Sequence, residues 1–315
     1  MLALVGALLI LFTLHDVVST TLVPRNGALS GRLTARLWHA ALWLHWRANT
    51  QHPLALAGVG LLLATVAVWA LLLWIGWSLV FLEGRPSVLT TQGGEPADPW
   101  AVIYFTGYAL ITLGNGDFRP AGPLWQQLAV LASMSGFFLF TLSITFLFSV
   151  VQAAVGMRAT AVYISSLGDT PFDLLARAYD GESCRALGAH VSTLAAQLSA
   201  ISQQHLAYPV LHYLHSGRRY NALPIQVAVL DEALSYLRAG VAGHGGFKEA
   251  ELAPLERAIG AFLLTLKAAH LEAADEAPPL RSLDALRQRG LPTHDAPTQS
   301  AARVCLTEGL TDVLG

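Results

Sequence analysis

The sequence predicts an all-α membrane protein whose second half is a soluble helical domain. The 315-residue chain is 54% hydrophobic and only 13% charged. Residues 1–157 carry 11 formal charges, whereas residues 158–315 carry 29. All eight tryptophans lie at or before Trp125, and the first lysine is Lys248. A nearly uncharged half followed by a charged half is typical of a membrane region joined to a cytosolic domain.

Three uncharged or nearly uncharged segments are long enough to cross a bilayer. The first, 1–23, contains one formal charge, and it lacks the basic start and small-x-small cleavage site of a signal peptide. We therefore expect it to be retained as an N-terminal transmembrane helix, with cleavage as the alternative. Segments 54–82 and 123–157 each exceed the roughly 20 residues that span about 30 Å of hydrocarbon.

The charges between these segments predict the orientation. Segment 24–53 holds four arginines and no acid, whereas 83–123 holds two arginines and four acids. The positive-inside rule places 24–53 in the cytoplasm, the N-terminus outside and the 158–315 domain in the cytoplasm. Leucine, tryptophan and arginine alternate at helical spacing within 24–53, which predicts a cytoplasmic amphipathic linker helix.

Two ionisable residues lie inside the first span, where such residues are candidates for a functional role. They are His15 and Asp16. We expect them to bond to a cytoplasmic arginine, and a protonation-sensitive gate is the alternative.

Between the second and third spans lies a helix too short to cross the bilayer. Asp98 is a preferred N-cap residue and Pro99 suits the first turn, so a helix is predicted over 99–111. A short apolar helix between two spans is a re-entrant element, and its C-terminal dipole favours a cation nearby.

The six residues after this helix form a distinctive motif. Residues 112–117 read Thr-Leu-Gly-Asn-Gly-Asp. Glycine reaches positive φ without steric cost, so Gly114 and Gly116 allow the backbone to alternate between left-handed and right-handed conformations. That alternation can aim successive carbonyls at one axis, where they can replace the water shell of a cation.

The order and spacing of these features resemble the potassium-channel superfamily, of the bacterial two-helix pore-domain type with a TxGxGD filter. The resemblance covers about residues 54–157. It implies a potassium-channel-like pore module with outer helix 54–82, pore helix 99–111, filter 112–117 and inner helix 123–157. The 1–23 span and the helical cytosolic domain 158–315 are additions to that module.

The resemblance also implies roles for individual residues. The filter would be Thr112, Leu113, Gly114, Asn115 and Gly116, with permeant K⁺ held by carbonyl and hydroxyl oxygens of Thr112, Leu113, Gly114 and Asn115. Asp117, Tyr104, Phe105 and Tyr108 would support the filter, with Tyr104 as a hydrogen-bond partner for Asp117. Gly136 would be the inner-helix hinge, and Phe140, Ile144 and Phe148 would line and gate the pore. One filter copy cannot surround an ion, so the resemblance implies a homotetramer in the lipid bilayer.

Asn115 departs from the family, which usually has tyrosine or phenylalanine there. An asparagine would have to hydrogen-bond a neighbour such as a pore-helix tyrosine. We expect a potassium channel, and the first alternative is a weakly selective sodium/potassium channel. A non-conducting membrane sensor or scaffold with a pore-like fold is an alternative of a different class.

Other function classes find little support. No catalytic constellation is visible, so we expect no enzyme activity and no cofactor apart from permeant K⁺ ions. The net charge of -2 shows no excess of basic residues of the kind that nucleic-acid-binding proteins carry. No span carries arginine or lysine at every third position, so a voltage sensor of that type is not expected.

The second half, 158–315, reads as helical, with apolar stripes at helical spacing. His205, His212 and His215 could share a face and sense pH or bind a metal, but Pro209 interrupts their helix. We expect ordinary packing for these histidines and inert thiols for Cys184 and Cys305. The sequence identifies no gating ligand.

Overall fold

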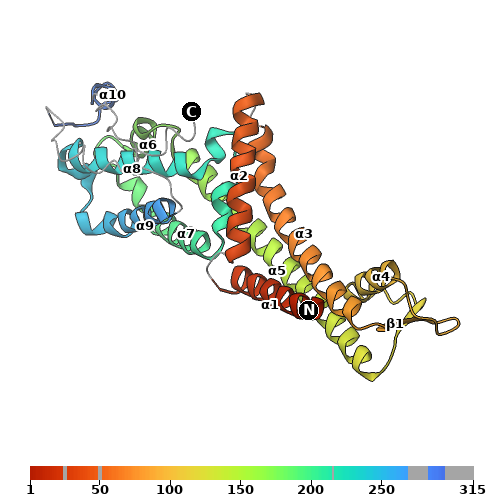
Figure 1. The fold of residues 1–315 in the computed structure, drawn as a ribbon. Helices are drawn as coiled ribbons and strands as arrows, with labels where there is room; N and C mark the ends of the chain where they lie inside the picture. Colours follow the sequence, from red (N-terminus) through yellow and green to blue (C-terminus); the bar gives the residue numbers. More distant parts are fainter. Residues whose placement is uncertain (24–26, 49–51, 215, 269–282, 295–315) are drawn as a thin grey trace. The chain divides into compact units, whose positions relative to one another are not determined.

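A computed structural model describes residues 1–23, 27–48, 52–214, 216–268 and 283–294 (Figure 1). Arg25, His215 and Cys305 lie outside these residues. The all-α membrane class is confirmed, because helices dominate and the one sheet in the described ranges has two strands of three residues. The chain divides into two compact units, Met1–Val150 and Val151–Gly315.

Three helices in the described part are long and apolar enough to cross a membrane. They are α1 (Leu2–Thr21), α3 (His52–Glu83) and α5 (Pro123–Leu167). The sequence placed the end of the apolar stretch at 157 and predicted that its helix continues beyond the bilayer. Helix α5 runs ten residues past that point, because the charge at Arg158 ends the apolar stretch without breaking the helix.

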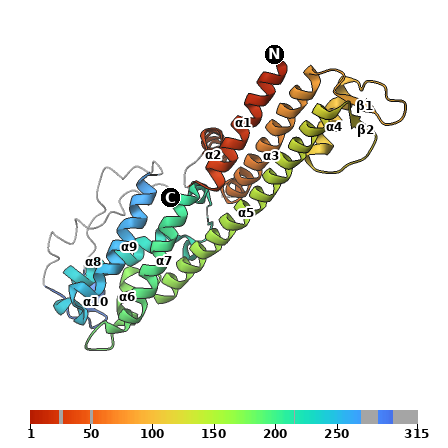
Figure 2. The same cartoon turned by 90° about the horizontal axis from the view of Figure 1, so that it is seen from below.

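Helices α1 and α3 pack side by side (Figures 1 and 2). Small residues make this close approach possible. A Cβ atom on Gly6 would lie 2.5 Å from the carbonyl oxygen of Gly76. The two helices therefore touch backbone to backbone. Within lipid the hydrophobic effect does not drive helices together, and close packing at small residues stabilises the pair instead.

Helix α2 (Ala28–Ala48) also packs on α3, and its first turn is held by a buried carboxylate of α1. Asp16 is 1% exposed and accepts hydrogen bonds from the backbone N–H of Leu29 at 2.9 Å and of Ser30 at 3.2 Å. The indole Nε1 of Trp69 in α3 donates to the same carboxylate at 2.9 Å. The partners of Asp16 among the described residues are thus the first turn of α2, including the Ser30 hydroxyl, and an indole. The predicted bond to a cytoplasmic arginine is not found among them, and Arg25 lies outside the described residues.

Aromatic side chains join α3 to α5. Trp77 donates from Nε1 to the Ser135 hydroxyl at 2.9 Å. The ring of Trp69 lies 6.3 Å from that of Phe146, and the ring of Phe81 lies 5.4 Å from that of Trp125. Buried aromatic pairs of this kind stabilise beyond the area they bury.

In the described residues, the C-terminal unit contains the end of α5, five further α-helices and short 3-10 helices. The five α-helices are α6 (Pro171–Ala178), α7 (Gly188–Ala207), α8 (Leu223–Ala239), α9 (Glu249–Ala268) and α10 (Asp284–Arg287). Helix α7 packs on α9 and α6 on α8. Leu198, Leu230 and Phe262 are fully buried, one from each of α7, α8 and α9, so the apolar stripes form one core.

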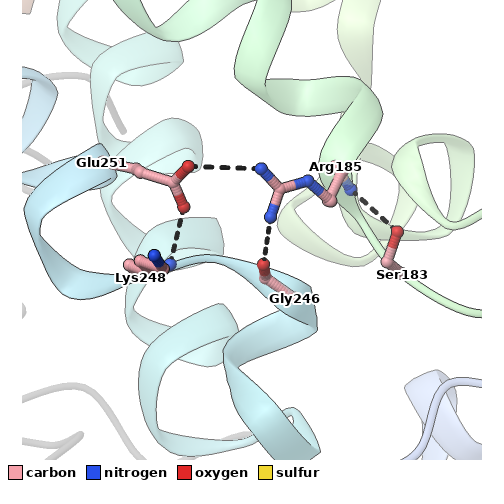
Figure 3. Close-up of polar contacts among 5 residues, drawn as sticks. All are labelled: Ser183, Arg185, Gly246, Lys248 and Glu251. Carbon is pink, nitrogen blue, oxygen red and sulfur yellow. Dashed lines mark hydrogen bonds and ion pairs between the residues drawn. The ribbon is translucent and has the colours of Figure 1, made fainter.

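An arginine ties the segment before α7 to the segment before α9 (Figure 3). Arg185 donates from Nη1 to the carbonyl of Gly246 at 2.6 Å and pairs through Nη2 with Glu251 at 3.2 Å. The other carboxylate oxygen of Glu251 accepts from the backbone N–H of Lys248 at 2.7 Å, and the Arg185 N–H donates to the Ser183 hydroxyl at 3.4 Å. Because both side chains of the Arg185–Glu251 pair are exposed to solvent, this ion pair adds little to stability.

Candidate functional site

The site begins with the short helix α4 (Pro99–Leu110). The Asp98 carboxylate accepts from the backbone N–H of Ala101 at 2.9 Å, which caps the first turn. Trp74 of α3 donates from Nε1 to the carbonyl of Ile103 at 2.9 Å. The hydroxyls of Ser78 and Thr106 share a hydrogen bond at 2.8 Å. Helix α4 is therefore fixed against α3 along its length.

Residues 112–117 directly follow α4, and their backbone alternates between positive and negative φ. Thr112, Gly114 and Gly116 have φ of 57°, 62° and 81°. The two glycines adopt this hand without cost, whereas a left-handed threonine costs on the order of 1 kcal/mol. Backbone N–H groups of Thr112 and Leu113 donate to carbonyls of the last turn of α4 at 3.2 and 2.9 Å. The strained threonine is thus held by the helix end that precedes it.

Three aromatic side chains of α4 lie behind this loop. The hydroxyl of Tyr104 accepts a hydrogen bond from the Asn115 amide. Tyr108 donates to the carbonyl of Phe118 at 3.0 Å. Phe105 is buried, with its ring 5.3 Å from that of Tyr108. The sequence suggested Asp117 as the hydrogen-bond partner of Tyr104, whereas in the structure the partner of the Tyr104 hydroxyl is Asn115.

The far end of the loop joins a small antiparallel sheet. Strand β1 (Val88–Thr90) pairs with β2 (Phe118–Pro120). Thr91 then donates from its backbone N–H to the carbonyl of Asp117 at 2.9 Å and from its hydroxyl to the carbonyl of Gly116 at 2.6 Å. Sequence reasoning missed Thr91, because it lies 25 residues before its acceptor and outside any motif.

Gly136 makes the contact between the inner helix and the end of α4. A Cβ atom there would lie 2.0 Å from the carbonyl oxygen of Leu110, so only glycine fits. Nearby, the Ser133 hydroxyl donates to the carbonyl of Ala109 at 2.8 Å. Helix α5 runs through Gly136 without a break. The structure therefore gives this glycine a packing role, and its role as a hinge remains a prediction.

An apolar stripe on α5 is uncovered in the single chain. Phe140, Ile144 and Phe148 recur every four residues and are 66%, 52% and 64% exposed. Such spacing places all three on one helix face. Leu113 of the loop is also exposed, at 58%. Helical packing within the described part of one chain leaves these side chains available to lipid or to other copies of the chain.

The C-terminal unit contains one acid with a strongly perturbed pKa. Burial, followed by the nearby charges of Glu256 and Glu232, raises the pKa of Asp231 to about 6. One oxygen of this carboxylate has no hydrogen-bond partner. Carboxyl groups in this situation favour the protonated form.

The histidines of this unit are packed in the interior. His205 bonds through Nδ1 to the carbonyl of Ile201 at 2.9 Å, and its ring lies 4.8 Å from that of His212. Burial, and then the neighbouring His205, lowers the pKa of His212 to about 4. Within the described residues, no group of three or more metal-ligating side chains was found. Both rings are thus packed in the interior of the unit, and Nδ1 of His212 is buried without a hydrogen-bond partner among the described residues.

The thiol of Cys184 is buried beside the loop that precedes α9. Its backbone N–H donates to the carbonyl of Gly245 at 2.8 Å, and a Cβ on this left-handed glycine would lie 3.3 Å from the sulfur. Burial, and then the charge of Asp180, raises the pKa of the thiol to about 11. The thiol is therefore protonated at neutral pH and inert, since only a thiolate is a strong nucleophile.

These features define a protein with a short apolar helix and a glycine-containing loop between two helices long and apolar enough to cross a membrane. A family model described as "Ion channel" matches residues 67–153, which include most of α3, all of α4, the loop and much of α5. An uncharacterized membrane protein of Bacillus subtilis (strain 168), YdjJ, is 32% identical over 289 residues, covering 91% of this chain and 84% of the relative. No solved structure matches the chain.

The chain belongs to the two-helix, potassium-channel-like ion channel family. It is a membrane protein of channel type and not an enzyme. The match ends at residue 153, so it does not extend over the helical C-terminal unit.

Proposed function

We propose that this protein is a homotetrameric, potassium-conducting channel whose selectivity filter is residues 112–116. The observation that carries the proposal is the alternating backbone of the loop, left-handed at Thr112, Gly114 and Gly116, directly after a capped helix too short to span. Such a backbone presents successive carbonyls as substitutes for the water shell of an ion. The carbonyls of Thr112, Leu113, Gly114 and Asn115 and the hydroxyl of Thr112 would bind K⁺ as it passes.

The geometry of a single loop supports the proposed tetramer. Each chain supplies one loop, and oxygens from one loop cannot surround a cation. Closed cyclic symmetry with four copies would give each ion a complete ring of ligands. The exposed Leu113 and the exposed stripe of Phe140, Ile144 and Phe148 fit surfaces that face the ion path or a neighbouring copy.

The inner-helix stripe would form the gate. Bulky apolar side chains that converge can close a pore by excluding water, without any plug. Phe140, Ile144 and Phe148 are spaced one helical turn apart, so four inner helices would bring three such rings together. Gly136 would allow these helices to bend, although it also packs on the end of α4.

The proposed orientation puts the N-terminus outside and the C-terminal unit in the cytoplasm. Arginines of segment 24–53 support it through the positive-inside rule. Residues 112–117 would then face outward, with the C-terminal end of α4 directed toward the cavity, where its dipole favours a cation.

Asn115 is the specific observation that favours a second candidate, a weakly selective monovalent cation channel. Position 115 itself therefore supplies no aromatic ring to pack against the rings of α4. The hydrogen bond of its amide to Tyr104, which belongs to a cluster with Tyr108 and Phe118, is the observation that favours a firm filter instead. We favour potassium selectivity because the hydrogen bond between Asn115 and Tyr104 takes the place of the missing ring contact.

The Gly114→Ala variant tests the filter assignment. Gly114 has φ of 62° and no atom within 4 Å of an added Cβ, so alanine would strain the loop without a clash inside the chain. We expect loss of K⁺ flux into liposomes while the purified protein keeps its tetrameric mass. Gly122→Ala is the matched control, because that glycine is equally open but lies outside the left-handed region.

Two results would contradict the proposal. Normal K⁺ flux in Gly114→Ala would remove the loop from the ion path. A monomeric or dimeric wild-type protein that carries no flux, even when Phe148→Ala widens the stripe, would favour a non-conducting sensor or scaffold.

A further inference from the structure

The outer end of the candidate filter is attached to the two-stranded sheet of β1 and β2, which lies outside the motif and is called the frame below. Strands β1 and β2 pair in the register Val88 with Pro120, Leu89 with Arg119 and Thr90 with Phe118. The backbone N–H of Thr91 extends this ladder by one step, to the carbonyl of Asp117 at 2.9 Å. The sheet therefore continues into the last residue of the loop.

Thr91 adds a side-chain contact one residue deeper. Its hydroxyl donates to the carbonyl of Gly116 at 2.6 Å, a length typical of a good O–H to O hydrogen bond. The φ of Gly116 is 81°, a conformation that glycine reaches freely and that sets the direction of the adjoining peptide. The last carbonyl of the candidate filter is thus held by a residue far away in the sequence.

A closed turn lies beside Thr91 and supplies a hydroxyl that can serve as a control. The neighbouring Thr90 donates from its hydroxyl to the carbonyl of Gln92 at 3.0 Å and accepts from the backbone N–H of Glu95 at 3.1 Å. Its own backbone N–H donates to the carbonyl of Glu95 at 2.9 Å. These bonds stay within the turn and do not reach the loop 112–117.

The frame is tied to the spanning and re-entrant helices at both strands. On β2, the carbonyl of Phe118 accepts from the Tyr108 hydroxyl of α4. Just before β1, the Ser87 hydroxyl donates to the carbonyl of Phe81 in α3 at 2.6 Å, and the backbone N–H of Ala121 donates to the carbonyl of Ser87 at 2.9 Å. Thr91 therefore projects from a support that is anchored to α3 and α4 as well as to the loop.

We propose that Thr91 is a positioning residue for ion selectivity, which holds the outermost filter carbonyl, that of Gly116, at a fixed distance from the ion path. The inference rests on the proposed function of residues 112–116. A carbonyl oxygen has two lone pairs, so the Gly116 oxygen can accept from Thr91 and present its second lone pair at the outer mouth, beyond the carbonyls of residues 112–115. Four copies repeat the same restraint around the axis, so one hydrogen bond per chain fixes the width of a whole ring.

The test compares three variants of the full-length channel in liposomes. Thr91→Val keeps the shape and loses the hydroxyl, Thr91→Ser keeps the hydroxyl, and Thr90→Val removes a hydroxyl that bonds only within the turn. We expect Thr91→Val to raise the sodium-to-potassium permeability ratio about fivefold, the factor that corresponds to one neutral hydrogen bond. Thr91→Ser and Thr90→Val should stay within twofold of wild type.

A second readout applies whatever the selectivity of the wild type. Ions that bind the folded protein protect it against heat, so the K⁺ concentration that gives half of this protection reports filter affinity. We expect Thr91→Val to need about fivefold more K⁺, with the other two variants unchanged. If Thr91→Val left the K⁺ concentration for half protection unchanged, or if Thr90→Val shifted it equally, the role of Thr91 would be overturned. The proposed function would remain intact. A wild-type protein with neither K⁺ flux nor K⁺ protection would instead overturn the proposed function.

Discussion

The buried carboxylate of Asp16 gives the sharpest structural prediction. It lies in the first spanning helix and accepts from the first turn of α2 and from the indole of Trp69. The substitution Asp16→Ala removes every one of these acceptors. No water reaches the site, since Asp16 is 1% exposed and Trp69 is completely buried.

The size of the effect follows from the groups left behind. Loss of a carboxylate cap from a helix N-terminus costs about 1 kcal/mol. An indole N–H left buried without an acceptor costs a further 1–3 kcal/mol, roughly. We therefore expect Asp16→Ala to lower the free energy of opening at the start of α2 by about 2–4 kcal/mol. At about 1.4 kcal/mol per factor of ten, amide exchange there would accelerate by roughly 30-fold or more.

Hydrogen exchange of the full-length protein, read by mass spectrometry on peptides covering residues 27–33, measures this directly. Asp16→Asn keeps one acceptor oxygen and should show a smaller acceleration. Thr13→Val is the matched control, because the buried Thr13 hydroxyl donates only to the carbonyl of Leu9 in its own helix. Unchanged exchange in Asp16→Ala, or an equal acceleration in Thr13→Val, would refute the assignment of Asp16 as the cap of α2.

Three further substitutions test other contacts. Gly136→Ala places a Cβ against the carbonyl of Leu110, so it should lower stability in thermal melts by about 1–3 kcal/mol and reduce K⁺ flux; an unchanged melt and flux would argue against the close contact. Tyr104→Phe removes the acceptor of the Asn115 amide and should raise the sodium-to-potassium permeability ratio without altering tetrameric mass, whereas an unaltered ratio would show that the pair does not hold the filter. Burial raises the pKa of Asp231 to about 6, so the ionised form destabilises the fold above that pH. Asp231→Asn should therefore raise the unfolding free energy by about 3 kcal/mol at pH 8, a gain that falls away between pH 6 and pH 4; equal gains at pH 8 and pH 4 in circular dichroism melts would contradict this reasoning.

Hydropathy and capping signals predicted the class of the fold because both are local. An apolar stretch long enough to span is visible at Leu2–Thr21, which carries one charge, and again in α3, whatever its neighbours are. The Asp98 cap is likewise a property of adjacent residues. Hydropathy reports where apolar sequence ends rather than where a helix ends, which is why α5 runs past Arg158 to Leu167.

Partners across the fold could not be predicted in the same way. The rule for ionisable residues in a span singled out Asp16, but its partners are backbone groups of a later helix and an indole 53 residues away. The motif pointed to Tyr104 and Asn115 separately, and the need of the amide for a partner suggested a pore-helix tyrosine. Thr91 gave no signal, because three-residue strands carry no periodicity and a threonine near a turn is unremarkable in sequence.

Potassium conduction through residues 112–116 is tested most directly by the reversal potential of the purified protein in a planar bilayer, with potassium on one side and sodium on the other. The proposed filter, with Asn115 held by Tyr104, predicts a reversal close to the potassium equilibrium potential. A reversal near zero would contradict potassium selectivity and would mean that the loop passes monovalent cations without discrimination.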